Sequence, residues 1–236
     1  MGAIFPVSLL AIWEILSRME VLSADGFSRP SRWIPALGRG LADGSLLLQT
    51  AQTFASAAEA LAIAAAAGIA LGALFGLFRP LERAAQLTVD ALRPIPSVAL
   101  IPLSLLVFGF TREMSAAVAA FACFWPILLV TAASVRSVDA RLIEVGRMLG
   151  FPVSRIILKF ALPAALPGIL VGIRVAAAIA IVVTVTTEIV ANPRGLGHAM
   201  TTAAETLQPE VVWATLAWIG VVGWLANWGL ERLGRR

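Results

Sequence analysis

Four stretches of this chain, each 18 to 22 residues long, carry no charged side chain. They cover residues 60–78, 94–111, 114–135 and 211–230, and a fifth stretch, residues 160–187, is interrupted only by Arg174. A helix needs about 20 mostly apolar residues to cross a hydrocarbon layer about 30 Å thick. The five stretches therefore predict membrane-spanning helices and indicate an all-α, polytopic membrane protein.

The composition excludes the soluble alternatives. Of the 236 residues, 59% are hydrophobic and 14% are charged, whereas soluble domains have about 45–50% apolar and about 25% charged residues. This chain has too few polar side chains to cover a globule, and it is too hydrophobic to be intrinsically disordered. A single Cys excludes an intrachain disulfide, and a single His excludes a His-based metal site. We expect no metal and no cofactor in this chain.

We expect about six spans in one transmembrane domain over residues 1–236, near residues 3–17, 56–78, 94–111, 114–135, 164–190 and 211–230. The first span is the shortest. Because no Lys or Arg precedes Arg18, we favour a retained helix over a cleaved signal peptide. Six spans put both termini on one side. Eleven Lys and Arg residues flank that side and six flank the other, which indicates cytoplasmic termini.

Small residues form smooth faces on two of the expected spans. Gly68, Gly72 and Gly76 recur at intervals of four in the second span, and Gly168 and Gly172 repeat the spacing in the fifth. Such faces let another helix backbone approach closely. Packing within one chain and a seam between two subunits both explain this pattern.

Prolines interrupt the expected third span at Pro94, Pro96 and Pro102. Each proline removes a backbone donor and bends or breaks a helix. Broken helices at membrane depth occur only inside protein or beside a watery cavity. We therefore interpret Pro96 and Pro102 as candidates for the wall of such a cavity.

The segment between the fourth and fifth spans, residues 136–163, predicts two short helices outside the bilayer. Asp139 suits an N-cap, and Gly150 suits the left-handed turn that ends a helix. Pro152 is expected in the first turn of a second helix over residues 153–161, and Pro163 at the entry to the fifth span. An apolar stripe at helical spacing lies between the caps, formed by Leu142, Ile143, Val145, Met148 and Leu149. A solvated loop does not need this stripe, so it indicates a protein partner.

This segment resembles the EAA loop of ABC-type import permeases. Glu144, Gly150, Leu162 and Pro163 match the family pattern in register, while Val145, Gly146 and Phe160 depart from it and stay small or apolar. Residues 93–96, 124–127, 134–139 and 195–197 resemble the nitrate, sulfonate and taurine branch of these permeases.

The resemblance implies a homodimer of six-helix subunits in a prokaryotic inner membrane, with two cytoplasmic ATPase subunits and an external substrate-binding protein. The loop is then a coupling helix docked on the ATPase. ATP and Mg²⁺ belong to that partner, because this chain has no Gly-Lys-Ser/Thr phosphate loop and is not expected to be an enzyme. The implied cargo is a small anion (sulfonate, taurine or nitrate), with a vitamin precursor or an aromatic acid as the alternative. We expect no nucleic-acid partner. The implied coupling residues are Asp139, Glu144, Arg147, Gly150, Phe151, Leu162 and Pro163.

Two charged residues lie within the expected fifth span. Arg174 is eleven residues past Pro163, about 16 Å along a helix and near mid-depth. It is either a cationic group in the translocation pathway or a structural tie to a neighbouring helix. Glu188, near the outer end, is too far along the helix to pair with Arg174. It is a gate, a contact for the binding protein, or a structural residue at the helix end.

Three rival functions remain open at the level of sequence. A secondary transporter needs intramembrane acids for coupling, and only Glu188 is placed deeply enough. An intramembrane protease needs a nucleophile and its base, whereas the one His, His198, lies beyond the fifth span. A passive membrane scaffold needs neither feature.

Overall fold

The computed structural model describes residues 4–19 and 27–233 of the chain. In these two ranges the elements are helices joined by turns, with no β-strand, which confirms the all-α prediction. In chain order they are α1 (Ile4–Arg18), α2 (Pro30–Ala42), α3 (Ser45–Leu77), α4 (Arg79–Leu92), the 3-10 turn η1 (Ser97–Leu100), α5 (Ile101–Phe108), α6 (Arg112–Arg136), α7 (Ala140–Met148), α8 (Val153–Ile156), the π turn η2 (Ile157–Ala161), α9 (Leu162–Val190), α10 (Gly195–Glu205) and α11 (Pro209–Leu233).

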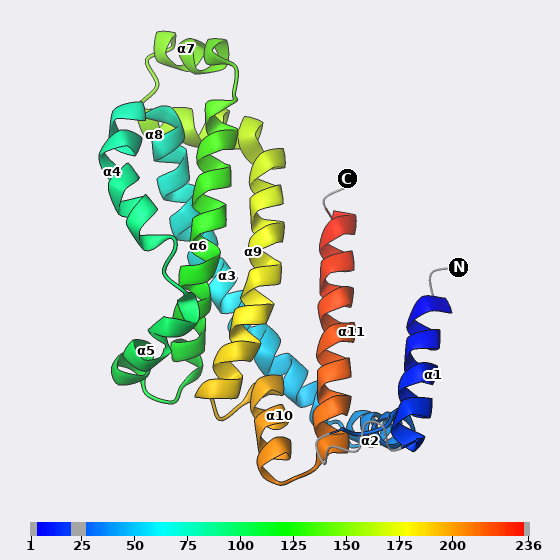
Figure 1. Cartoon of the computed structure of the whole chain (residues 1–236). Helices are drawn as coiled ribbons and strands as arrows, with labels where there is room; N and C mark the ends of the chain where they lie inside the picture. Colours follow the sequence, from blue (N-terminus) through cyan, green and yellow to red (C-terminus); the bar gives the residue numbers. More distant parts are fainter. Residues whose placement is uncertain (1–3, 20–26, 234–236) are drawn as a thin grey trace.

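Three long helices, α3, α6 and α9, form the centre of the molecule (Figure 1). The glycine face of α3 lies against α6, where a Cβ added to Gly72 would collide with the carbonyl oxygen of Leu128. The glycine face of α9 meets α6 as well, since a Cβ added to Gly168 would collide with Ser134. Both faces therefore pack within the chain, as the first of the two explanations predicts.

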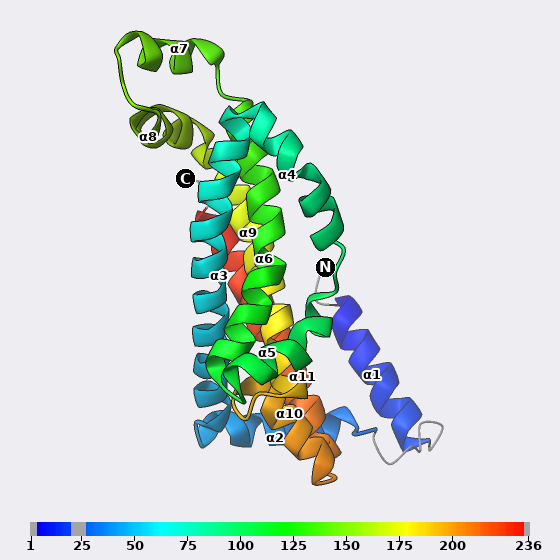
Figure 2. The same cartoon turned by 90° about the vertical axis from the view of Figure 1, so that its left-hand side faces the viewer.

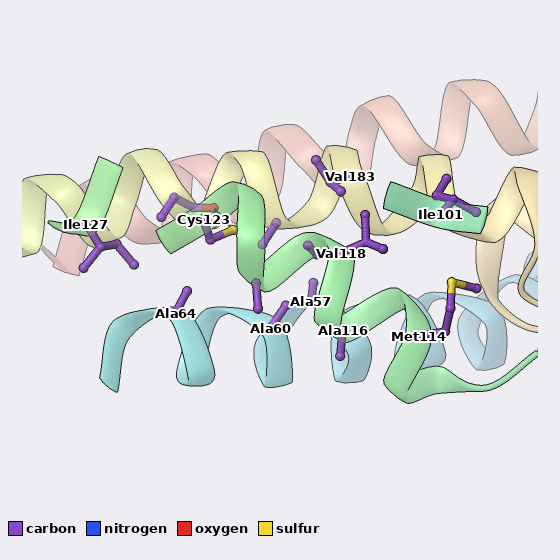
Figure 3. Close-up of a cluster of buried hydrophobic side chains, with 14 residues drawn as sticks. Ala57, Ala60, Ala64, Ile101, Met114, Ala116, Val118, Cys123, Ile127 and Val183 are labelled. Carbon is purple, nitrogen blue, oxygen red and sulfur yellow. Dashed lines mark hydrogen bonds between the residues drawn. The ribbon is translucent and has the colours of Figure 1, made fainter. Parts of the chain in front are cut away.

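The largest apolar cluster fills the space between these three helices (Figure 3). Ala60 and Ala64 of α3 are almost fully buried, because their small side chains let α6 approach and cover them. Met114 and Ile127 of α6 fill the remaining volume and are completely buried. Because α5 adds Ile101 to the same cluster, the short helix is anchored to the central three.

The candidate membrane spans are fewer than the six that we predicted. Among the described residues, four helical runs are long and apolar enough: Ser45–Leu77, Arg112–Arg136, Val153–Glu205 and Pro209–Gly229. A fifth exists only if α4 and the η1–α5 unit count together, and these are bent by 83°. With 15 residues, α1 falls short of the usual spanning length.

The expected span over residues 94–111 is broken, as its prolines predict. Helix α4 ends at Leu92, and the chain resumes as a four-residue 3-10 turn and the eight-residue α5. Pro94 and Pro96 lie in the break, where neither has a backbone N–H to offer a helix. The 14-residue helix α4 lies between the expected second and third spans and was not predicted.

The two ends of the molecule carry different short elements. Both Figure 1 and Figure 2 place α7 and α8 at one end of the central helices, and α2 and α10 at the other. Helix α2 lies between α1 and α3, outside the expected spans. Its buried Trp33 packs with Ala214 of α11, and the rings of Trp13 and Trp213 lie 4.7 Å apart. These contacts hold α1 and α11 together.

Candidate functional site

Helix α7 is defined by a cap at each end, and both were predicted. The Asp139 carboxylate accepts a 2.9 Å hydrogen bond from the backbone N–H of Arg141. At the other end Gly150 has a φ of +68°, its N–H donates to the Arg147 carbonyl oxygen, and the N–H of Phe151 donates to that of Gly146. This pair of bonds is the Schellman motif, which ends a helix at a left-handed residue.

Contacts with the following turn position α7 beside α8 and η2. Gly146 is buried against this turn, and a Cβ added to it would lie 3.2 Å from the Ile156 side chain. The ring of Phe151 lies 5.9 Å from that of Phe160, and the Arg155 guanidinium sits 5.3 Å from the Phe151 ring centroid. The one helix expected over residues 153–161 is instead α8 followed by the π turn η2. Pro152 caps α8 rather than occupying its first turn.

The remaining surface of α7 is apolar and exposed. Met148 is 85% exposed and Leu149 is 62% exposed, and Leu142 and Val145 lie on the same side. Glu144 and Arg147 are exposed on other sides of the helix. Leu162 and Pro163 form the first turn of α9. A small helix with four exposed apolar side chains has the form of a docking element.

A second constellation lies at the opposite end, around Glu188. This side chain is 2% exposed, and its Oε2 accepts from the Thr53 hydroxyl at 2.9 Å and from the backbone N–H of Gly197 at 3.1 Å. Thr53 in turn accepts from the N–H of Leu196 at 3.0 Å. The carboxyl group thus lies at the N-terminus of α10, where unpaired helix amides favour an acidic group.

Two glycines make this arrangement possible. Gly195 has a φ of +91°, and a Cβ there would collide with the Glu188 carboxylate. The Gly195 N–H donates to Gln52 Oε1 at 3.1 Å. A Cβ on Gly197 would collide with the carbonyl oxygen of Val185. Residues 195–197 therefore connect α3, α9 and α10 by direct hydrogen bonds.

The other predicted pathway residues are not brought into this constellation. Arg174 is half-buried near the middle of α9, and no hydrogen bond or ion pair joins it to another residue in the described ranges. Its neighbours Val171 and Val175 are 51% and 50% exposed. Pro96 caps η1, and Pro102 lies in the first turn of α5. Both prolines therefore lie at or beside the bend of the broken span.

Comparison with known proteins decides what kind of chain this is. Residues 36–236 match the family described as binding-protein-dependent transport system inner membrane component. The chain belongs to this family. It is a permease subunit of an ABC importer, and the secondary-transporter, protease and scaffold alternatives are thereby set aside.

Curated relatives cover nearly the whole permease. SsuC of Bacillus subtilis, named for aliphatic sulfonates transport, is 31% identical over 100% of this chain and 85% of its own. TauC of Escherichia coli, the taurine transport system permease protein, is 28% identical over 97% of this chain and 85% of its own. A chain of the inward-facing MetNI methionine ABC transporter has a TM-score of 0.69 at 19% identity, covering 80% of this chain and 95% of that chain. The MetNI likeness shows a shared fold.

Sequence reasoning missed two residues of the Glu188 constellation in this permease. Thr53 and Gln52 lie in an uncharged part of α3, and nothing in their spacing indicates a bond to a residue more than a hundred positions away. The sequence signal that could have indicated this cluster was the glycine pair Gly195 and Gly197, a few residues after the acid Glu188. Of the alternatives for Glu188, its burial favours the structural one.

Proposed function

We propose that this permease imports a small organic or inorganic anion, such as a sulfonate, taurine or nitrate. The names of its relatives support this class, since they include aliphatic sulfonates, taurine and nitrate transport. Arg174 adds a cationic group without a described counter-ion at mid-length in α9, and such a group stabilises an anion where water is scarce. A vitamin precursor or an aromatic acid is the alternative cargo.

Competitive uptake tests the cargo. In proteoliposomes that contain the whole importer, excess taurine, ethanesulfonate or nitrate should inhibit uptake driven by ATP. Arg174→Gln should lower the uptake rate without impairing assembly, while Arg39→Gln, on the exposed side of α2, should leave the rate unchanged. Equal rates for both variants would remove Arg174 from the pathway.

The proposed assembly contains a second copy of this permease, two ATPase subunits and an external binding protein. The ATPases hold ATP and Mg²⁺, since this chain has no Gly-Lys-Ser/Thr loop. Both termini and α7 then face the cytoplasm. The relevant residues of this chain are those of the coupling segment: Asp139, Glu144, Arg147, Gly150, Phe151, Leu162 and Pro163.

The coupling role rests on one observation, the exposed apolar side of α7 between two well-formed caps. Burying Met148 and its neighbours in a cleft of the ATPase would remove apolar surface from water, and the capped helix would transmit the motion of the ATPase to η2 and α9. Glu144 and Arg147 would then contact the rim of that cleft.

Two matched variants test this docking. Met148 and Leu207 are 85% and 87% exposed at opposite ends of the molecule. We expect Met148→Glu to reduce co-purification of the ATPase, because it puts a charge in an apolar interface, and Leu207→Glu to leave it unchanged. If Met148→Glu retains the ATPase and its stimulation by substrate, α7 is not the coupling helix.

A further inference from the structure

Helix α4 has its polar side turned towards the protein. Its four charged residues and its one glutamine all line a cavity between α3, α4 and α6, and they are Arg79, Glu82, Arg83, Gln86 and Asp90. Its leucines lie outside this lining, and Leu87 is 82% exposed. A surface helix of a soluble domain shows the opposite arrangement.

This inversion is typical of a helix that separates water from apolar surroundings. None of the residues of α4 is buried, and its leucines are exposed, with Leu81 at 43%, Leu87 at 82% and Leu92 at 39%. In a membrane, the leucine side is satisfied by acyl chains, whereas the charged side needs water or a polar ligand. The charged lining therefore favours water over acyl chains in the cavity behind α4.

The cavity has a volume of about 520 Å³. Phe75 of α3 and Leu129 and Ala132 of α6 add apolar surface to its lining, and Arg136 closes it beside the start of α4. One water molecule occupies about 30 Å³ in the liquid, so a small hydrated anion fits. Figure 2 shows α4 beside α6 in the half of the molecule that carries α7.

The charges on the cavity wall are unevenly paired. Glu82 forms an ion pair with Arg136, whereas Arg79 and Arg83 have no partner among the described residues. These two exposed arginines are four positions apart on one helix, where like charges repel each other. Asp90 is the other acid of the lining, about two turns past Arg83. Two close arginines without counter-ions indicate an anion between them.

We propose that the cavity behind α4 is a water-filled anion site at the inner mouth of the pathway, with Arg79 and Arg83 as its ligands. The proposal rests on the anion-import function and adds the place where the anion is held before release. Arg guanidinium groups bind sulfonate, phosphate and carboxylate oxygens with paired hydrogen bonds. An anionic lipid headgroup shares this chemistry, so the test is made in neutral phosphatidylcholine nanodiscs.

Adjacent residues on α4 provide a matched pair of probes. In a Cys123→Ala background of the whole importer, Gln86→Cys faces the cavity and Leu87→Cys faces the opposite way. We expect the membrane-impermeant 2-sulfonatoethyl methanethiosulfonate to modify the first at least tenfold faster than the second. Ethanesulfonate should slow the modification of Gln86→Cys, and adding Arg79→Gln and Arg83→Gln should remove this protection.

Two results would overturn the proposal. Equal modification of Gln86→Cys and Leu87→Cys would show that α4 does not separate water from apolar surroundings. Absence of protection by ethanesulfonate, or protection that persists without both arginines, would show that they do not hold the anion. The proposed cargo is tested separately by uptake. An importer that fails to transport any sulfonate but keeps the protection pattern would refute the cargo and retain the anion site.

Discussion

Replacing Thr53 by Val tests whether the Glu188 constellation holds α10 in place. Valine keeps the size of threonine but removes the hydroxyl that donates to Glu188 and accepts from the N–H of Leu196. The Thr53 side chain is 1% exposed, so water does not replace these bonds. Each buried group left without a partner costs about 1–3 kcal/mol. The Leu196 N–H loses its partner, whereas Glu188 keeps its bond from the Gly197 N–H, so the free energy of opening of α10 should fall by about 1–3 kcal/mol.

Amide hydrogen exchange in nanodiscs measures this opening directly. The lower end of the range corresponds to about fivefold faster exchange in the first turn of α10. Thr186→Val is the matched control, because the Thr186 hydroxyl bonds only to the Val182 carbonyl oxygen one turn earlier on the same helix. We expect the control to change exchange less than twofold. The reasoning is refuted if both variants exchange at the same rate around Leu196 and Gly197.

Three further predictions concern other parts of the chain. Gly72→Ala should reduce the yield of folded permease in detergent by forcing α3 away from the Leu128 carbonyl oxygen, while Gly223→Ala, which meets open space, should leave the yield unchanged. Gly150→Val should strain the left-handed turn by about 1–2 kcal/mol and uncouple ATP hydrolysis from uptake; normal coupling would contradict the role of this turn. The backbone N–H of Ser45 donates to the Asp43 carboxylate and holds the pKa of Asp43 below its ordinary value. This hydrogen bond therefore stabilises the α2–α3 junction fully above about pH 4. The stabilisation is lost as the pH falls through the lowered pKa that Asp43 has in the folded state. This loss should be visible in Ser45 amide exchange corrected for the intrinsic rate, and it should be absent in Asp43→Asn.

The sequence was sufficient where a local rule decides the structure. Asp139 and Gly150 were predicted as the caps of α7, because N-caps and left-handed turns depend on one residue and its immediate backbone. The uncharged stretches likewise predicted α3, α6, α9 and α11, since length and hydropathy suffice for membrane helices.

Features that depend on long-range contacts or on unusual surroundings were not predictable in this way. Thr53 finds Glu188 only after α3 and α9 have packed, so no spacing in the chain indicates the pair. Helix α4 was not predicted, because a charged helix whose polar side lines an internal cavity contradicts the usual pattern. The break after Leu92 was expected from the prolines, but the 83° bend depends on how α5 packs onto α6.

The glycine contacts of α3 and α9 have a mechanical consequence for the whole permease. Both helices are fitted closely onto opposite parts of α6, so that sliding one past another would drive backbone atoms into side chains. The three helices must therefore tilt together as one rigid body during a transport cycle. Changes in backbone conformation are then confined to segments outside these three helices, such as the kink between Leu92 and Ser97.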